Sequence, residues 1–223
     1  MLAARALACR RGGRLVFARL ALDVAPGGAL LLRGPNGSGK STLLRCLAGL
    51  IRPAAGEVLW QGAPIAGDPD AHRTRLHYLG HLDGAKAALT VWENLRFWQR
   101  LRGRGDPAAA EAALDAFALE PLAERPARAL SAGQRRRLGL ARLLAAPAPL
   151  WLLDEPNAAL DDAGQAALAR AIAAHRAQGG LALIAAHGGF PLPGAETLAL
   201  ERHQPAAAAP GDAPGDAPEG APA

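Results

Sequence analysis

Short apolar runs separated by turn signals characterise the first part of the chain. Leu2 to Cys9 and Leu15 to Val24 are rich in apolar residues, and Gly12-Gly13 lies between them. Glycine pairs favour tight turns, so the pattern predicts two strands with a turn between them. Further short runs predict strands at 57–60 and 76–80 and buried strands at 29–32, 150–153 and 181–186.

Longer segments with helical spacing separate these runs. Between Thr90 and Leu101 the apolar residues recur every three or four positions, which is typical of one face of a helix. Asp106-Pro107 marks the start of another helix that reaches about Leu119. The alternation of strands and helices predicts an α/β fold with a mostly parallel sheet covered on both faces. The remaining helices are expected at 41–50, 134–145 and 161–178.

Length and composition narrow the possible classes. The 223 residues suit one domain, expected at 1–203, whereas the Ala-, Pro-, Gly- and Asp-rich segment 204–223 is expected to be disordered because it cannot bury a core. No apolar run of about 18 residues predicts a membrane span, so a role at a membrane would require a spanning partner. The net charge of +5 without a long basic run favours a solvated surface over nucleic-acid binding. Cys9 and Cys46 are isolated, which suits a reducing cytosol.

A glycine-rich loop between a predicted strand and a predicted helix fits the pattern G-x-x-x-x-G-K-[ST]. Its glycines let successive backbone N–H groups turn inward toward phosphate oxygens, and the helix that follows presents its positive N-terminus to the same anion. The lysine is expected to reach the β- and γ-phosphates of a nucleotide, and the serine after it to ligate Mg²⁺. The predicted nucleotide-binding residues are Gly34, Pro35, Asn36, Gly37, Ser38, Gly39, Lys40, Ser41 and Thr42.

Two acidic residues follow the apolar run at 150–153. In a parallel sheet, ligands gather at the carboxyl ends of the strands. Asp154 is therefore expected to hold the Mg²⁺ that accompanies ATP, and Glu155 to activate the attacking water as general base. A solvated acidic turn after a strand is common, and it is the upstream phosphate loop that favours the catalytic interpretation.

The helix expected at 134–145 has a second candidate anion site at its start. Ser131 and Gln134 form the pattern S-x-x-Q, which predicts a capping box. Gly133 leaves backbone N–H groups uncovered, and the helix dipole adds positive charge. Arg135, Arg136 and Arg137 follow, so we expect an electropositive site.

At this point the chain resembles the ATPases of ABC transporters. Leu-Ser-Ala-Gly-Gln at 130–134 is similar to the family's L-S-G-G-Q signature, and Asp154-Glu155 is similar to its Walker B element with the catalytic glutamate. The resemblance covers about residues 1–202. It implies a P-loop ATPase core with an N-terminal antiparallel β part and a helical subdomain at about 82–146.

The resemblance also implies roles for further residues. Asp161, in Ala-Ala-Leu-Asp at 158–161, corresponds to the D-loop, and His187 to the switch histidine. ATP and Mg²⁺ are the implied ligands. Two ATPase domains pair head to tail in this family, so a second copy or a paralogue is expected to complete each site. Its signature residues would then contact the ATP: Ser131, Ala132, Gly133 and Gln134.

Two positions depart from the family pattern. The aromatic residue that often stacks on adenine is replaced by Arg11, and the nearest aromatic residue is Phe17. A guanidinium can also stack on a planar ring. The Q-loop glutamine, which senses the γ-phosphate and communicates with the membrane partner, corresponds to His81.

A narrower resemblance rests on Leu-Gly-His-Leu-Asp-Gly at 79–84, on Leu-Thr-Val-x-Glu-Asn-Leu at 89–95 and on Gly-Glu-Val-Leu-Trp-Gln-Gly at 56–62. These segments are similar to the haem-export ATPases of cytochrome c maturation. That family implies a multi-spanning membrane subunit as partner, haem-delivery proteins as further partners, no nucleic acid, and a peripheral position on the cytoplasmic face of the bacterial inner membrane.

Other interpretations of the sequence are open. One is an ABC ATPase for another cargo, such as a lipid, a drug or a polysaccharide. Another is an ABC-type protein of DNA repair or translation, although such proteins usually carry two ATPase domains or a long coiled-coil insertion. A P-loop kinase or GTPase would leave residues 130–134, Glu155 and His187 unexplained.

Overall fold

Two sheets form the framework of the protein, for which a computed structural model describes residues 1–103, 105–186 and 190–204. A five-stranded parallel sheet has the order β6-β7-β8-β3-β9, and a four-stranded antiparallel sheet has the order β2-β1-β4-β5. The parallel strands are β3 (Ala29–Arg33), β6 (Leu76–Leu79), β7 (Leu150–Asp154), β8 (Leu181–Ala185) and β9 (Glu196–Ala199). The antiparallel strands are β1 (Leu2–Arg11), β2 (Arg14–Val24), β4 (Ala55–Trp60) and β5 (Ala63–Pro64).

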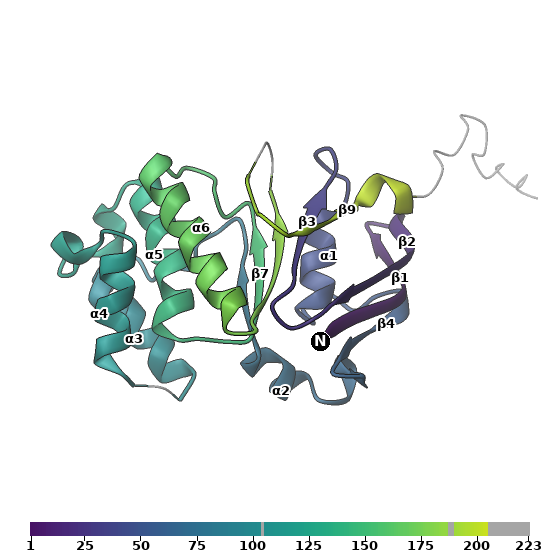
Figure 1. Ribbon diagram of the computed structural model, residues 1–223, viewed down its shortest axis with the longest axis horizontal. Helices are drawn as coiled ribbons and strands as arrows, with labels where there is room; N and C mark the ends of the chain where they lie inside the picture. Colours follow the sequence, from purple (N-terminus) through teal and green to yellow (C-terminus); the bar gives the residue numbers. More distant parts are fainter. Residues whose placement is uncertain (104, 187–189, 205–223) are drawn as a thin grey trace, which may run out of the picture.

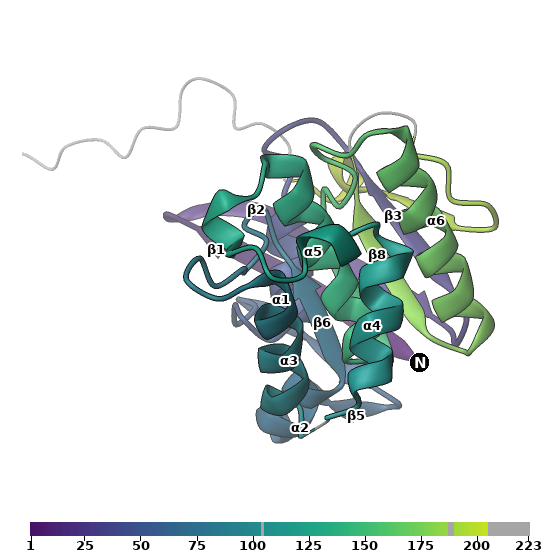
Figure 2. The same cartoon turned by 90° about the vertical axis from the view of Figure 1, so that its left-hand side faces the viewer.

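The parallel sheet lies in the middle of the molecule and is covered on both faces (Figure 1). One face packs against α1 (Lys40–Leu47) and the antiparallel sheet, and the other against the long helices. Figure 2 shows this helical region in front of the sheet. The remaining helices are α2 (Pro69–Thr74), α3 (Val91–Leu101), α4 (Pro107–Ala116), α5 (Ala132–Ala145) and α6 (Asp162–Ala177), with a 3₁₀ turn at Leu200–His203.

Strand β7 shows why the sheet has two apolar faces. Leu150 and Leu152 pack into the core shared with α1 and the antiparallel sheet. Trp151 and Leu153 pack into the core shared with α3 to α6. All four are at most 2% exposed, so alternate side chains are buried on opposite faces, as expected for a strand in the middle of a parallel sheet. The α/β class with an antiparallel part and a helical part is confirmed.

Several element boundaries differ from the sequence prediction. Helix α1 ends at Leu47 and not at residue 50, because Gly49 adopts a left-handed conformation (φ 70°) and its N–H donates to the Cys46 carbonyl. Helix α5 begins at Ala132, two residues earlier than expected, and α4 ends at Ala116. The sequence analysis did not predict α2, β5 or β9.

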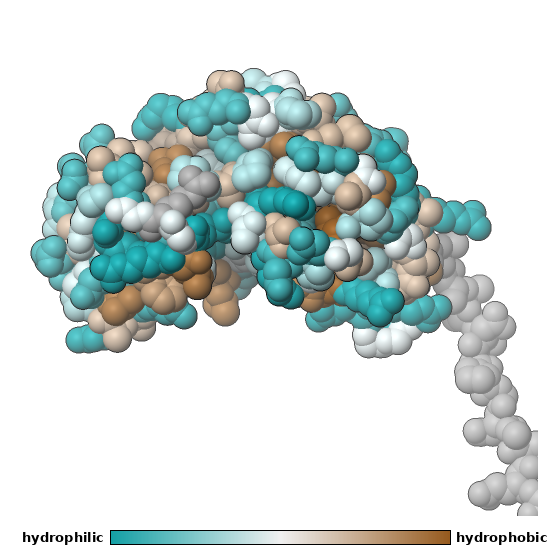
Figure 3. Space-filling view, turned by 90° about the horizontal axis from the view of Figure 1, so that it is seen from below, coloured by the Kyte–Doolittle hydropathy of each residue, from teal (hydrophilic) through white to brown (hydrophobic). Residues whose placement is uncertain are grey.

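The surface alternates between polar and apolar side chains. On the face shown in Figure 3, apolar patches are separated by polar groups, and the outline is hollowed along one edge. Within the described ranges, no helix combines the length and hydropathy needed to cross a bilayer. The segment 204–223 was expected to be disordered. Its residues beyond Gln204 lie outside the described part of the chain.

Candidate active site

The glycine-rich loop connects β3 to α1 at the carboxyl edge of the parallel sheet. Gly34, Gly37 and Gly39 all have positive φ angles, of 146°, 79° and 102°. Gly39 also lies against the antiparallel sheet, where an added Cβ would come within 2.6 Å of the Val16 Cγ1 atom. A side chain at Gly39 would therefore be both strained and crowded, so the loop needs its glycines at these positions.

Lys40 and the start of α1 are arranged to receive an anion. The Lys40 Nζ atom donates to the Gly34 carbonyl at 2.7 Å and to the Pro35 carbonyl at 3.0 Å. The Ser38 hydroxyl is buried and has no hydrogen-bond partner among the described residues. Helix α1 has no side-chain cap and no acidic residue in its first turn. Its N-terminal N–H groups and positive dipole end are thus available for phosphate oxygens.

A cleft of about 320 Å³ lies over this loop. Arg11 lines it, at the position where an adenine-stacking residue is expected, whereas Phe17 is fully buried in the core. Arg45 also lines the cleft, and its Nε atom donates to the Tyr78 hydroxyl at 3.2 Å, which raises the pKa of Arg45. The remaining lining residues are Val16, Asn36, Gly37, Ser38, Gly39, Lys40, Ser41, Thr42 and Glu155.

The register of the parallel sheet brings the acidic pair to the same edge. Asp154 pairs with Ala185 of β8, which in turn pairs with Leu32 of β3, two residues before the loop begins. Asp154 is 4% exposed, and Glu155 reaches the cleft. Glu155 has a left-handed backbone (φ 48°), and its N–H donates to the Ala185 carbonyl at 2.7 Å. A left-handed glutamate is uncommon and indicates that packing holds this turn.

The oxygen donors of the site suit magnesium bound together with a nucleotide. No group of three or more His, Cys, Asp or Glu side chains in the described part of the chain is placed to hold a metal. Ser41 lines the cleft and offers a hydroxyl, whereas Asp154, which does not line the cleft, offers one carboxylate from the end of β7 at the same sheet edge. Mg²⁺ prefers hard oxygen ligands and commonly takes one or two carboxylates plus substrate phosphates, so these residues fit the ion.

The predicted capping box at the start of α5 is present. The Ser131 Oγ atom accepts a hydrogen bond from the Gln134 N–H at 3.2 Å, and the Gln134 Oε1 atom accepts one from the Ser131 N–H at 2.9 Å. Gly133 permits a close approach, because an added Cβ would come within 2.7 Å of the Ala159 carbonyl oxygen. Ser131 and Ala132 are exposed. Among the described residues, none from 131–134 lines the cleft over the phosphate loop.

The three other predicted site residues have different surroundings. Asp161 is the N-cap of α6, and its Oδ1 atom accepts a hydrogen bond from the Gly164 N–H at 2.9 Å. His81 is exposed in the segment that follows β6. His187 lies outside the described residues, which resume at Phe190.

Arg136 was missed as an individual residue, because the sequence shows only three consecutive arginines. We expected all three to make the start of α5 electropositive. Instead the Arg136 side chain is 6% exposed and donates hydrogen bonds to the backbone carbonyls of Asp154 and Glu155. The 3.6-residue period of α5 could have distinguished Arg136 from the two neighbouring arginines, because Arg136 lies on the same buried side of the helix as Gly139 and Leu140.

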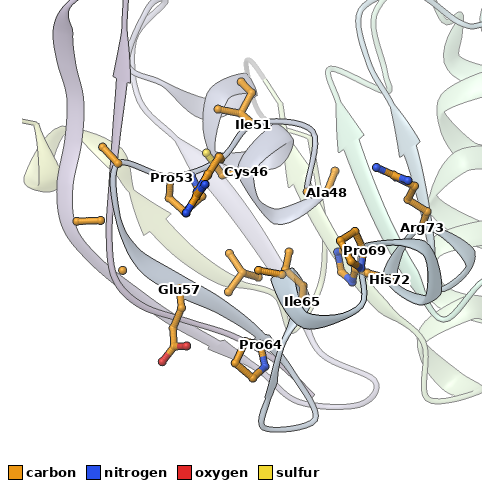
Figure 4. A pocket seen from close by; sticks show the side chains of 17 residues that line it. Cys46, Ala48, Ile51, Pro53, Glu57, Pro64, Ile65, Pro69, His72 and Arg73 are labelled. Atoms are coloured by element: carbon orange, nitrogen blue, oxygen red, sulfur yellow. The ribbon is translucent and has the colours of Figure 1, made fainter.

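A larger hollow of about 800 Å³ lies at the opposite end of α1 (Figure 4). Cys46 and Ala48 line it from α1, and Ile65, Pro69 and His72 from the segment that carries α2. Burial raises the pKa of the Cys46 thiol to about 12, and the neighbouring Cys9 adds to this shift. The two cysteines that appeared isolated in the sequence are both buried free cysteines and lie close together in the fold.

Residues 17–158 match the family described as ABC transporter. The "Cytochrome c biogenesis ATP-binding export protein CcmA" of Rhodospirillum rubrum is 57% identical over 199 residues, which cover 89% of this chain and 85% of that protein. The protein of the same name from Paramagnetospirillum magneticum is 54% identical over 205 residues, with 89% and 93% coverage.

Solved structures agree on the fold. An ABC transporter ATP-binding protein from Pyrococcus furiosus superposes with a TM-score of 0.81 at 23% identity, covering 92% of this chain and 99% of that one. The ATP-binding cassette MJ0796, described as a dimer in a post-hydrolysis state bound to ADP and Pi, gives 0.74 at 24% identity, with 84% and 88% coverage. Together with the match over residues 17–158, these relatives place the chain in the ABC transporter family of ATP-binding proteins and, within it, among the cytochrome c biogenesis ATP-binding export proteins.

Proposed function

We propose that the chain is the ATP-hydrolysing subunit of an export complex that serves cytochrome c maturation. The observation that carries this proposal is the meeting of two separate segments at one sheet edge. The phosphate loop follows β3, the Asp154-Glu155 turn follows β7, and both loop residues and Glu155 line one cleft. The names of the relatives from R. rubrum and P. magneticum supply the biological context.

Each residue of the cleft has a specific role in this proposal. Residues 34–39 and the start of α1 hold the triphosphate of ATP, and Lys40 exchanges its two loop carbonyls for the β- and γ-phosphates. Ser41 and Asp154 would hold Mg²⁺, which would neutralise phosphate charge. Glu155 accepts a proton from the attacking water, and His187 assists at the γ-phosphate.

A second copy of the chain completes the site. Ser131 is exposed, and residues 131–134 do not line their own chain's cleft within the described structure. An exposed helix start that does not line its own chain's cleft favours a head-to-tail pair, in which the signature of one copy covers the ATP of the other. The MJ0796 cassette, described as dimeric and bound to ADP and Pi, supports pairing of two copies. Asp161 lies in the neighbouring loop and is expected near the same interface.

The membrane partner is a multi-spanning subunit that contacts the exposed segment around His81. The chain is accordingly peripheral, on the cytoplasmic face of the bacterial inner membrane, and acts without nucleic acid. Haem is the proposed cargo or the group whose release from haem-delivery proteins is driven by hydrolysis. The narrower resemblance in the sequence supports this choice over a lipid, drug or polysaccharide.

A stain for covalently bound haem tests the biological role. Cells that lack the gene are complemented with wild type or with Glu155→Gln, and their c-type cytochromes are compared. We expect the haem bands to vanish in the deletion strain and to return only with wild type. Persistent bands in the deletion strain would point to another cargo.

Purified protein tests the chemistry. Glu155→Gln is expected to keep Mg-ATP binding and to lose turnover by at least about 10²-fold, because it removes the general base. Ser131→Arg is expected to abolish hydrolysis and nucleotide-dependent pairing while binding of ATP to the single chain persists. Near-normal hydrolysis by Glu155→Gln would refute the role of Glu155.

A further inference from the structure

One buried arginine of α5 joins three segments that are far apart in the sequence. The Nη2 atom of Arg136 donates to the carbonyls of Asp154 at 2.7 Å and Glu155 at 2.6 Å. Its Nε atom donates to the Pro156 carbonyl at 3.3 Å, and its Nη1 atom to the Gly80 carbonyl at 2.9 Å. The side chain thereby ties the helix that begins at the signature to the Glu155 turn and to the residue before His81.

The environment of Arg136 is costly for a charge. The residue is 6% exposed, and burial lowers the pKa of its guanidinium, although the nearby charges of Asp83, Asp154 and Glu155 partly oppose this shift. Each hydrogen bond described for it goes to a backbone carbonyl, and within the described chain no carboxylate lies within ion-pair distance. Well-packed apolar residues often stabilise such positions better than buried charges do. Stability alone therefore gives a weak reason for an arginine at this position.

The bonds of Arg136 converge on the backbone that aims Glu155. The carbonyls of the two peptide units that flank the Glu155 Cα atom are both held by a single nitrogen atom. Glu155 has a left-handed φ of 48°, a conformation that costs a non-glycine residue energy and persists only where its surroundings enforce it. Two sets of contacts hold this conformation: Arg136 donates to the Asp154 and Glu155 carbonyls, and the Ala185 carbonyl accepts from the Glu155 N–H.

Arg142 shows what a buried arginine of the same helix does without this contact. It donates to the carbonyls of Tyr78 at 2.6 Å and Asp83 at 3.3 Å, and its guanidinium lies 4.7 Å from the centre of the Trp98 ring. Its described bonds fix β6 and the segment that follows it, and they do not extend to residues 154–156. Arg136 differs because it joins that segment to the catalytic turn.

We infer that Arg136 is a positioning residue for ATP hydrolysis, which holds the Asp154–Glu155 backbone so that the Glu155 carboxylate faces the attacking water. The inference rests on the proposed function of Glu155. It predicts a loss of turnover without a loss of nucleotide binding, because the phosphate loop makes no described contact with Arg136.

The test uses the full chain, purified with its membrane partner through a tag, and compares Arg136→Gln with Arg170→Gln. Arg170 is an exposed arginine of α6 that has no role in the proposed site and no described contact with the turn. We expect Arg136→Gln to lower kcat on the order of tenfold to a hundredfold, as for a misplaced catalytic group, with the KM for ATP and the affinity for a fluorescent ATP analogue within about twofold of wild type. Arg170→Gln is expected to keep kcat within about twofold.

Coupling to Glu155 is tested in the double variant. Because Arg136 acts through Glu155, adding Arg136→Gln to Glu155→Gln is expected to cause no further loss in single-turnover hydrolysis. If Arg136→Gln does not fold, Arg136→Lys decides the matter, since an ammonium has three donors and no planar fork and cannot reproduce the four bonds. We expect reduced kcat and unchanged KM there too.

Three results would overturn the inference: wild-type kcat in Arg136→Gln or, where that variant does not fold, in Arg136→Lys; a parallel loss of kcat and nucleotide affinity; or additive losses in the double variant. Failure of the proposed function is distinguishable, because Glu155→Gln would then turn over like wild type whatever Arg136 does. If Glu155→Gln is inactive and Arg136→Gln is fully active, the proposed function stands and only the inferred role of Arg136 is refuted.

Discussion

Helices α1 and α5 both begin at a predicted phosphate contact, but their first turns are built in opposite ways. At α1 the N-cap is Gly39, with φ 102° and no side-chain bond to the helix. At α5 the N-cap is Ser131, which exchanges two hydrogen bonds with Gln134. One helix start is left open to a ligand, and the other is already satisfied by its own residues.

The two helices are alike at their other ends. The Nε2 atom of His72 donates to the carbonyl of Leu47, the last residue of α1, at 2.9 Å. His77 makes the same kind of contact at 2.6 Å with Ala146, the residue that follows α5. The difference at the N-termini is therefore a local feature of each first turn. It leaves the first N–H groups of α1 open to an anion or to water, whereas the first turn of α5 is closed by its own capping box.

The largest effect is expected from removing the positive charge of Lys40 at the uncapped start of α1. Lys40→Ala is expected to weaken Mg-ATP binding by about 3 kcal/mol, roughly a hundredfold in Kd, because a charge-assisted phosphate contact is lost. Isothermal titration in a Glu155→Gln background measures it. Lys86→Ala is the matched control, since Lys86 is the other lysine and lies over the Phe97 ring. Equal weakening in both variants would contradict the assignment of the phosphate site.

A smaller effect is expected at the capped helix. Ser131→Ala removes the cap of α5 and is expected to lower stability by about 1 kcal/mol, or roughly 2–4 °C in Tm, while single-chain ATP affinity stays unchanged. Thr90→Ala is the control, because Thr90 forms the same capping box with Glu93 at the start of α3. Both variants should lose similar stability in a thermal melt. A loss of ATP affinity in Ser131→Ala would show that the two helix starts are not independent.

Acid is expected to have the smallest effect on this comparison. It protonates histidines at the C-terminal ends of α1 and α5, where the two helices are alike. Burial lowers the pKa of both His72 and His77, and for His77 the Arg102 guanidinium beside it lowers the pKa further. The folded state therefore binds these protons less readily than the unfolded state. Stability should be constant above about pH 6.5, the ordinary histidine pKa, and should fall as the pH drops below it.

Urea denaturation at pH 7.5 and at pH 5.5 measures this dependence. His72→Gln and His77→Gln each remove one titrating group, so each should reduce the loss of stability between the two pH values. A pH dependence that is unchanged in both variants would exclude these histidines as its source.

The sequence was informative where neighbouring residues act together. The phosphate loop, the acidic pair and the capping box each lie within nine residues, and their local spacing is enough to predict the contacts or the conformation they need. Residues 69–74 and 196–199 gave no comparable signal. Helix α2 is six residues long and β9 four, and neither has a long enough apolar pattern to distinguish it from a loop. Strand β9 forms because β3 offers it a partner at the sheet edge.

The local pattern of residues was thus sufficient for the fold class and for the phosphate loop, because glycine conformation, helix caps and strand burial depend on positions close in the chain. The direction of Arg136 depended on three-dimensional packing. Three consecutive arginines look alike as letters, yet the rotation of α5 against β6 and β7 turns the middle one toward Gly80 and Glu155. Contacts across 56 and 19 residues are set by the order in which strands pair, which no local spacing encodes.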